Sequence, residues 1–276
     1  FIYSFPYCAG DKKFYDLIFS KTNKYPQERW EFEKSIELIS KSRYENPRIL
    51  EIGSGDGAFL KKLIHNKLTL KSCITSIEYS EYGKSKIKSL GINCLSIDIK
   101  DNKEKLPYKK YDFICLFQVL EHLDSLNELI TILKSLLSRK GKILIAVPNE
   151  KIIDFNESNG ALLDMPPNHV GRWSKSSFKK LCEINKLKLI ENHIEPFSLK
   201  KFLLMFFSYR FLRKSQDNNS IAAFIKYRIN KNLVWILTRL FIIIDFLCSP
   251  LILLKILILG KSLGGETQLS IISMNN

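Results

Sequence analysis

One stretch constrains the fold of this 276-residue chain more than any other. The apolar segment Ile49-Leu50-Glu51-Ile52 runs directly into Gly53-Ser54-Gly55-Asp56-Gly57, so a buried strand is followed by three glycines at alternate positions. Glycine lets the backbone turn sharply and lets a ligand lie against the main chain. A helix that begins after such a turn offers free N–H groups. The stretch therefore predicts an open α/β sheet that binds a nucleotide-like ligand at the end of its first strand.

The residues around this turn alternate between strand and helix patterns. Strands are expected at 48–52, 72–77, 92–97, 111–117 and 142–147, and helices between them at 58–66, 80–90 and 125–138. A helix at 174–185, a strand at 186–194 and a last strand at 266–273 follow. Strands separated by helices form βαβ units with a mostly parallel sheet.

The spacing and charge of the glycine turn restrict the kinds of ligand that it could bind. The pattern is G-x-G-x-G, which differs from the G-x-G-x-x-G of dinucleotide sites and from the phosphate-binding P-loop. Glu51 and Asp56 would repel a pyrophosphate, but they suit the ammonium and sulfonium of S-adenosylmethionine (SAM). Glu78 closes the second strand, where an acid can accept hydrogen bonds from both ribose hydroxyls. Asp98 closes the third strand, where the adenine edge would lie; the alternatives are that Asp101 takes its place or that Asp98 is a simple strand-end cap.

Five motifs fall at the expected strand ends. They are ILEIGSGDG (49–57), SIEYS (76–80), SIDIKD (96–101), YDFICLFQVLEHL (111–123) and GKILIAVPN (141–149). Together they resemble the class I SAM-dependent methyltransferases, in particular the bacterial group with small-molecule and glycan substrates, over residues 12–195 and the last strand. The resemblance implies an α/β fold with a Rossmann-like seven-stranded, mostly parallel sheet and an α-helical insertion before the last strand.

The resemblance also implies the residues that bind SAM. The residues around its methionine and ribose would be Glu51, Gly53, Ser54, Gly55, Asp56 and Gly57. Glu78 would hold the ribose, with Tyr79 beside it. Asp98 and Ile99 would lie at the adenine, and Gln118 near the sulfonium.

Two of the four histidines are candidates for catalysis, because a hydroxyl acceptor must lose its proton. His169 lies in a segment similar to the Pro-Pro-His-His-x-x-x-Trp lid of some of these enzymes, with Asn168 in place of one histidine. His122 follows the fourth strand, and capping or packing under the loop is its alternative role. The six cysteines form no CxxC pair, which favours reduced thiols. No metal ligands are predicted.

The chain carries 43 Lys and Arg against 28 Asp and Glu, a formal net charge of +15. Residues 198–232 hold eight of these cations and one acid, and 233–260 are almost wholly apolar. A single membrane span would separate the last strand from its sheet, so a helical hairpin with arms at 233–248 and 251–260 is expected instead. Two interpretations stay open for 199–260: contact with an anionic membrane surface, or packing as a homodimer interface or enlarged core.

Four segments follow from these patterns. They are an N-terminal helical cover at 1–47, with a short helix at 14–19, a SAM-binding core at 48–197, a basic and apolar insertion at 198–262, and the last core strand at 263–276. No signal-peptide pattern stands near the start. A cytoplasmic protein, peripheral on the inner face of a membrane if the insertion docks there, is therefore expected.

The predicted function is SAM-dependent methyl transfer to an oxygen of a glycan, a lipid-linked sugar or another small molecule. One alternative is a catalytically silent methyltransferase-fold protein that serves as a membrane-associated binding module; the intact turn and Glu78 oppose it. Another is an NAD-dependent oxidoreductase, which the glycine spacing opposes. No nucleic-acid partner is expected, because the turn is acidic and Phe117-Gln118-Val119-Leu120 stands where an Asn/Asp-Pro-Pro-Tyr-type motif would be.

Overall fold

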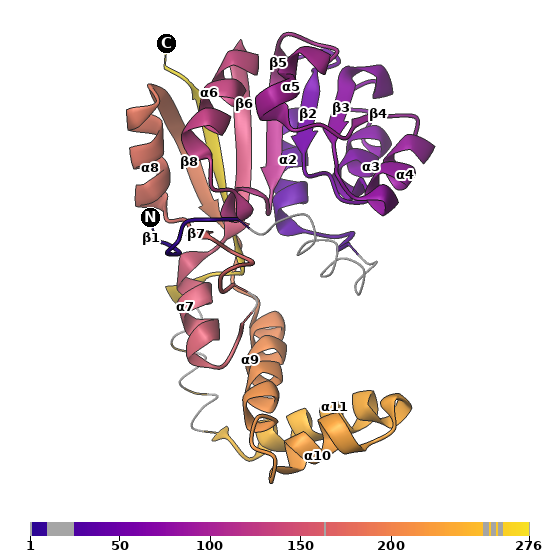
Figure 1. Cartoon of the computed structure of the whole chain (residues 1–276), viewed down its shortest axis with the longest axis vertical. Coiled ribbons are helices and arrows are strands. Elements are labelled where there is room, and N and C mark those ends of the chain that lie inside the picture. Colours follow the sequence, from indigo (N-terminus) through magenta and orange to yellow (C-terminus); the bar gives the residue numbers. More distant parts are fainter. Residues whose placement is uncertain are drawn as a thin grey trace. The chain divides into compact units, whose positions relative to one another are not determined.

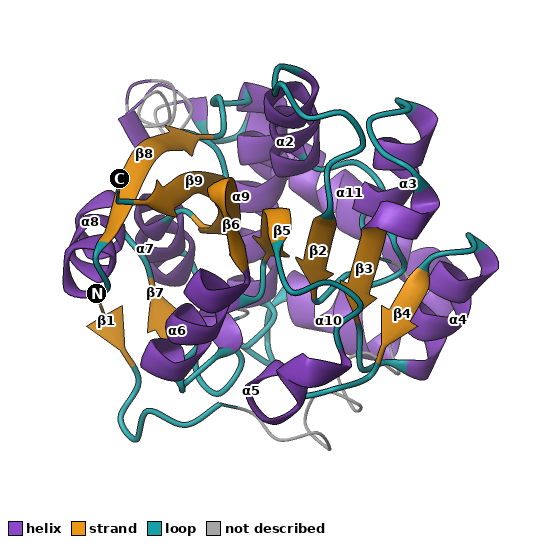
Figure 2. Ribbon diagram, turned by 90° about the horizontal axis from the view of Figure 1, so that it is seen from above, coloured by secondary structure: helices purple, strands orange, loops and turns teal. Residues whose placement is uncertain are grey.

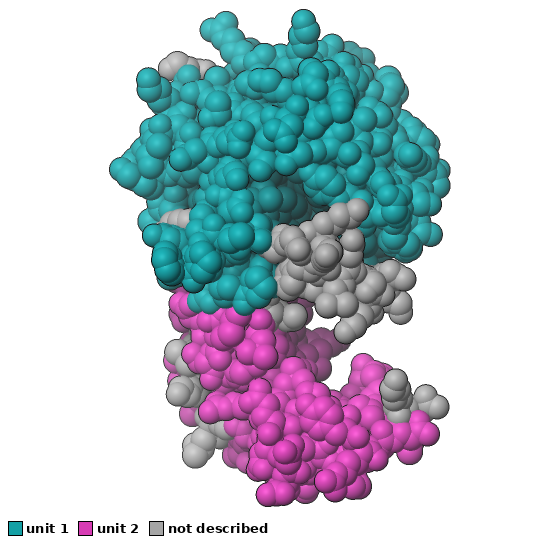
Figure 3. Space-filling model, viewed as in Figure 1, with its two compact units in different colours: residues 1–148, 166–193, 267–276 teal, residues 149–165, 194–266 magenta. Residues whose placement is uncertain are grey.

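The computed structural model describes residues 2–9, 25–162, 164–250, 254, 258 and 262–275. The chain divides into two compact units, shown in different colours in Figure 3. Unit 1 comprises residues 1–148, 166–193 and 267–276, and unit 2 comprises 149–165 and 194–266. Unit 2 thus adds 149–165 to the segment that the sequence marks as an insertion.

A seven-stranded sheet forms the centre of unit 1. In chain order its strands are β2 (Ile49–Ile52), β3 (Ile74–Ile77), β4 (Asn93–Leu95), β5 (Tyr111–Phe117), β6 (Leu137–Pro148), β8 (Leu187–Ile194) and β9 (Thr267–Met274). Their spatial order is β4-β3-β2-β5-β6-β9-β8 (Figure 2). The pairs from β4 to β6 are parallel, and β9 runs antiparallel to β6. The predicted α/β sheet is confirmed.

Helices cover both faces of this sheet, because successive strand residues point to opposite sides. On one face Ile49 and Phe113 pack with α2 (Trp30–Ser40), α3 (Ala58–His65) and α4 (Glu81–Ser89). On the other face Leu50 and Ile114 pack with the second set of helices. That set is α5 (Ile99–Asn102), α6 (Leu126–Leu136) and α8 (Lys175–Ile184). Figure 2 shows α2 and α3 on one side of the strands and α5 and α6 on the other.

Short 3₁₀ turns lie between the helices and strands of unit 1. These are the 3₁₀ turns η1 (Lys71–Cys73), η2 (Lys103–Lys105) and η3 (Leu120–His122). A separate two-stranded ribbon joins β1 (Ile2–Tyr3) to β7 (Gly171–Arg172) in antiparallel register. The ribbon brings the start of the chain beside the segment that follows His169.

Two details depart from the sequence-based expectation. The helix expected at 125–138 ends at Leu136, because Leu137 pairs with Tyr111 and so begins β6. The segment 1–47, predicted as a helical cover, contains strand β1 as well as helix α2. The short helix expected at 14–19 lies outside the described residues.

Unit 2 is helical, with α7 (Glu150–Ser158), α9 (Leu199–Lys214), α10 (Ile221–Arg228) and α11 (Lys231–Leu247) (Figure 1). Phe202, Phe206 and Phe207 of α9 form one apolar cluster with Ile152 of α7. Asp245 of α11 accepts two hydrogen bonds from the guanidinium of Arg210, at 2.8 and 3.0 Å. These contacts tie α11 to α9.

The predicted hairpin arm at 233–248 corresponds to α11, and most of the arm at 251–260 lies outside the described residues. Within the described part of the chain, no helix combines the length and the apolar character needed to cross a membrane.

Candidate functional site

The glycine turn joins β2 to α3 at the carboxyl edge of the sheet, and two of its glycines are required by close neighbours. Gly53 and Gly55 have φ values of +73° and +54°, a region that L side chains avoid. A Cβ on Gly55 would lie 2.9 Å from the ring of Tyr25, and one on Gly53 would lie 2.5 Å from Cγ2 of Val119. A side chain at either position would therefore force the turn or its neighbour to move.

Glu78 at the end of β3 links the second strand to this turn. One of its carboxylate oxygens accepts the backbone N–H of Gly55 at 2.8 Å, and the other accepts the N–H of Ser80 at 2.8 Å. The residue is only 8% exposed. Because each carboxylate oxygen has a further acceptor position, Glu78 can still accept hydrogen bonds from ligand hydroxyls.

Two more acids lie at the same turn. Glu51 is 2% exposed, and Asp56 is buried and accepts a hydrogen bond from Nε2 of Gln27 at 2.6 Å. Burial raises the pKa of Glu51 well above its usual range, and the nearby carboxylates of Glu78 and Asp56 raise it further. A cation bound here would offset that repulsion, so the turn favours a positively charged ligand over a phosphate.

The remaining turn residues support the backbone. The hydroxyl of Ser54 donates to the carbonyl of Glu51 at 3.2 Å and accepts from the hydroxyl of Ser76 at 2.8 Å. Gly57 directly precedes α3 in the left-handed conformation. Ser54 and Gly57 therefore support the backbone of the turn. The hydrogen bonds of the Ser54 side chain do not by themselves indicate contact with a ligand.

The expected adenine end follows β3 and β4. The hydroxyl of Tyr79 donates to the carbonyl of Ile97 at 2.9 Å, and burial raises its pKa to about 12. Asp98 caps α5 by accepting the N–H of Lys100 at 2.9 Å. The side chain of Ile99 lies in the hydrophobic core under the sheet. Asp98 thus has a capping role of its own, and Ile99 has only its main chain to offer a ligand.

Gln118 follows β5 with a φ of +56°, and its amide is held by α2. Its Nε2 donates to a carboxylate oxygen of Glu31 at 3.2 Å, and Arg29 pairs with the same oxygen at 3.2 Å. Glu31 is buried. Glu31 and Gln27 were not predicted as site residues from the sequence, because their partners lie 29 or more positions away along the chain.

His122 and His169 come together at this edge. Their ring centroids are 4.7 Å apart at an interplanar angle of 74°. Nδ1 of His122 lies 2.6 Å from the carbonyl oxygen of Asn168. Because a carbonyl only accepts hydrogen bonds, Nδ1 is the donor.

The other two histidines lie apart from these groups. His65 is the last residue of α3, and His193 on β8 pairs with Glu191 at 2.5 Å. Trp173, near the predicted lid, stacks on Phe178 in the core with ring centroids 5.0 Å apart.

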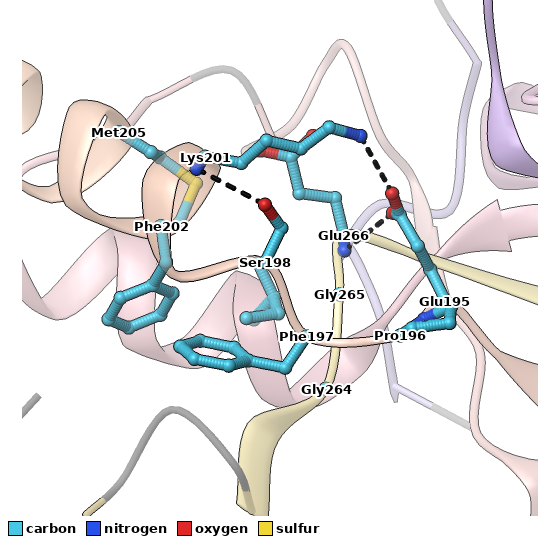
Figure 4. Close-up of a pocket in the computed structure, with 11 residues that line it drawn as sticks. Glu195, Pro196, Phe197, Ser198, Lys201, Phe202, Met205, Gly264, Gly265 and Glu266 are labelled. Carbon is cyan, nitrogen blue, oxygen red and sulfur yellow. Dashed lines mark hydrogen bonds and ion pairs between the residues drawn. The ribbon is translucent and has the colours of Figure 1, made fainter. Parts of the chain in front are cut away.

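Unit 2 has a small pocket of its own between Glu195–Phe202 and Gly264–Glu266 (Figure 4). Lys201 pairs with one carboxylate oxygen of Glu195 at 2.8 Å, and the N–H of Glu266 donates to the other at 3.0 Å. Both oxygens of Glu195 therefore join segments of unit 2. No residue predicted for the site lines this pocket.

Comparisons with known proteins agree with this geometry. A family described as "Methyltransferase domain" matches residues 24–192, which is more than half of the chain. No curated protein matches the sequence.

Many solved structures share the fold. A SAM-dependent methyltransferase from Archaeoglobus fulgidus is 18% identical with a TM-score of 0.53, covering 96% of this chain and 100% of its own. Phosphoethanolamine N-methyltransferase 2 from Haemonchus contortus, in complex with S-adenosyl-L-methionine, is 13% identical with a TM-score of 0.55, covering 95% and 56%. A SAM-dependent methyltransferase from Thiobacillus denitrificans, in complex with S-adenosyl-L-homocysteine, is 12% identical with a TM-score of 0.51, covering 97% and 100%. At these identities the likeness shows the fold.

Proposed function

The chain belongs to the methyltransferase-domain family, and from that premise we propose that it transfers the methyl group of SAM to an oxygen of a small molecule, a glycan or a lipid-linked sugar. The observation that carries the proposal is the glycine turn closed by Glu78 and lined with buried acids. These groups suit a cationic nucleoside and oppose a pyrophosphate. The structural relatives crystallised with SAM or its demethylated product support the same cofactor.

The residues present fit SAM along the carboxyl edge of the sheet. Gly53 and Gly55 allow the left-handed backbone of the turn along which the methionine and ribose part would lie, and Glu51 and Asp56 supply the negative charge there. Glu78 would hold the ribose hydroxyls. Tyr79, Asp98 and Ile99 would flank the adenine, and Gln118 would lie near the sulfonium.

When bound, SAM supplies a methyl group that is already activated by its sulfonium. The chain therefore has to align the acceptor, exclude water and remove the acceptor proton. Tyr25 lies against Gly55 and closes that part of the turn. Because Nδ1 of His122 donates to the carbonyl of Asn168, Nε2 is the ring nitrogen that would take the proton of a hydroxyl. His169 is the second candidate for this role.

Calorimetric titration with SAM tests the cofactor. We expect wild-type protein to bind SAM with a dissociation constant in the micromolar range. Gly55→Arg should weaken binding by at least about 100-fold, or about 2.7 kcal/mol, because its side chain would fill the turn and displace Tyr25. Glu78→Ala should also abolish most binding.

Gly91→Ala is the matched control. Gly91 has a φ of +74°, but the nearest atoms to its Cβ position lie 3.8 Å away. It therefore carries similar backbone strain without crowding a site, and SAM binding should be unchanged. Preference for NAD over SAM, or binding of neither, would refute the proposal. SAM binding without turnover of any acceptor would favour the silent binding module.

For unit 2 we propose contact with an anionic membrane surface through α10 and α11. Large apolar side chains stand exposed there, among them Phe224, Tyr227, Ile243 and Ile244. Lys226 and Arg228 lie in the last turn of α10, and Nζ of Lys226 lies 4.9 Å from the ring centroid of Tyr227. An exposed apolar patch next to cations is typical of helices that lie in the membrane interface. Such a location would favour a lipid-linked or hydrophobic acceptor and a peripheral position on the cytoplasmic face.

Sedimentation with vesicles tests this contact. Wild-type protein should sediment with phosphatidylserine-containing vesicles and much less with neutral phosphatidylcholine vesicles, with binding weakened by salt. Lys226→Glu/Arg228→Glu should reduce sedimentation several-fold, since each basic residue contributes about 1 kcal/mol near such a surface.

Lys179→Glu/Lys180→Glu on α8 makes the same charge change in unit 1 and should leave sedimentation nearly unchanged. No vesicle binding, together with a homodimer in analytical ultracentrifugation, would favour the homodimer interface instead.

A further inference from the structure

We infer that Glu121, His122 and His169 form a binding site for a divalent transition-metal ion. Each residue offers one ligand atom, and the three atoms all lie within 4.8 Å of one another. Two imidazoles and one carboxylate are the protein ligands of several catalytic zinc sites, and imidazole suits zinc, iron and cobalt ions. The cluster was not predicted from the sequence, which places His169 on a loop far from the other two.

The distances are compatible with an ion after small side-chain rotations. Around a four-coordinate ion with bonds of about 2.1 Å, the ligand atoms lie about 3.4 Å apart. The rings of His122 and His169 already meet edge to face with centroids 4.7 Å apart. Closing the remaining gap needs torsional adjustment and no movement of the sheet.

One ring is already oriented as a metal ligand. Histidines that bind metals almost always donate their other N–H to a carbonyl or carboxylate, which selects the tautomer. His122 does this through Nδ1 and the carbonyl of Asn168, at 2.6 Å. Its Nε2 is therefore the ring nitrogen that would coordinate the ion.

Two hydrogen bonds from other segments of the chain hold the backbone around the cluster. The N–H of Val170 donates to the carbonyl of Glu121 at 2.9 Å, so the residue after His169 is tied directly to the first ligand. The hydroxyl of Tyr7 donates to the carbonyl of Leu123 at 2.7 Å. Metal sites depend on ligands held by surrounding hydrogen bonds, and here such bonds hold both of the segments that carry ligands.

The burial of the Glu121 carboxylate also favours a cation bound at this cluster. Glu121 is 1% exposed, and a buried carboxylate is stabilised by a positive charge at its side. A divalent ion bound among the three ligand atoms would supply that charge. With the ion bound, Nε2 of His122 is coordinated and does not act as the base; the ion instead lets an acceptor hydroxyl lose its proton to water more readily. That role rests on the proposed function; the binding of the ion does not.

Cobalt titration of the full chain tests the site. Protein without a polyhistidine tag is stripped with EDTA, exchanged into chelator-free buffer and titrated with Co²⁺, while visible absorption is recorded. Wild-type protein should show saturable bands that reach one ion per chain, and Zn²⁺ should displace them. His169→Asn and Glu121→Gln should each weaken binding by about 100-fold or more, because losing only an outer partner costs about 10–100-fold.

His193→Gln is the matched control, because it removes another imidazole that pairs with a carboxylate, and among the residues that the structure describes no third metal-ligating group lies beside that pair. It should bind Co²⁺ as wild type does. If wild-type protein shows no saturable bands, or if His169→Asn and His193→Gln bind equally, the metal site is refuted and the cluster is only a hydrogen-bonded support. Circular dichroism confirms that each variant is folded, and His169→Asn, with its partly exposed side chain, serves if Glu121→Gln does not fold.

The same EDTA-treated protein is titrated with SAM. SAM binding without cobalt binding would refute the metal site alone. Cobalt binding without SAM binding would refute the proposed function alone.

Discussion

The two units depart from the usual distribution of side chains in opposite ways. Unit 1 buries charged groups: Glu51, Glu78 and Glu121 are at most 8% exposed at the carboxyl edge of the sheet. Unit 2 exposes apolar groups: Ile243 and Ile244 of α11 are more than half exposed. Buried carboxylates are costly unless something compensates their charge, and exposed apolar clusters mark contact surfaces.

The difference indicates which kind of partner each unit is suited to bind. The buried acids of unit 1 suit small cations, namely the sulfonium of SAM and a metal ion. The apolar and basic helices of unit 2 suit a wide surface. Four measurements test this difference between the buried carboxylates of unit 1 and the exposed apolar groups of unit 2.

The largest effect is expected in the core of unit 1. Phe59 of α3 is fully buried, with its ring centroid 4.8 Å from that of Phe117 and 5.7 Å from that of Phe32. Phe59→Ala should lower the free energy of unfolding by about 3–5 kcal/mol, measured by urea denaturation. A loss below about 1 kcal/mol would mean that this face of the sheet is not packed as described.

The next effect concerns the charge of Glu78. Glu78→Gln keeps the shape of the side chain but replaces one acceptor oxygen by an amide donor. SAM affinity should fall by about 10–100-fold, or about 1.4–2.7 kcal/mol, in calorimetry. Glu81→Gln, on the exposed first turn of α4, is the control and should bind as wild type does. Equal losses in both variants would argue against a ribose contact.

A smaller effect is expected from the protonation of Glu51. Its raised pKa means that free protein tends to hold a proton there, and a bound cation opposes that protonation. SAM binding should therefore release protons, and affinity should rise with pH until Glu51 is ionised in the free protein. Calorimetry in buffers of different ionisation enthalpy measures the release.

Glu51→Gln should abolish the buffer dependence, whereas Glu104→Gln in η2 should preserve it. Uptake of protons on binding would contradict the expected sign.

The smallest change in stability is expected on α11. Ile244 is 60% exposed, so Ile244→Ser should change the free energy of unfolding by no more than about 0.5 kcal/mol. The same variant should bind phosphatidylserine vesicles less tightly, because it removes apolar area from the proposed contact. A large loss of stability would instead indicate that this side chain packs against another copy of the chain.

Much of the fold was predictable because its signals are local. The strand β2, the glycine turn and the strand β5 are each encoded by a few neighbouring residues, and the largely apolar runs of the two strands match their almost complete burial. The start of β6 was not predictable from the sequence, because Leu137 continues the helical apolar pattern of α6. In the structure Leu137 pairs with Tyr111 and therefore belongs to the sheet. The proposed domain bounds and the roles of the site residues stay predictions.

The site was predictable only in part. Gln118 was singled out from its motif, but its partner Glu31 is 87 residues away in the sequence. His122 and His169 were each identified as candidates, yet nothing local indicates that His122 donates to Asn168, 46 residues away, or that Glu121 joins them.

By itself, then, the sequence determined the parallel sheet, the glycine turn and the acids at its strand ends, because backbone conformation and burial depend on nearby residues. Only the tertiary structure decided which side chains meet across the carboxyl edge: Tyr25 over Gly55, Gln27 with Asp56, and the cluster of Glu121 with two histidines. These contacts depend on how loops far apart in the chain pack against one another, and the apolar periodicity of the sequence carries no information about that packing.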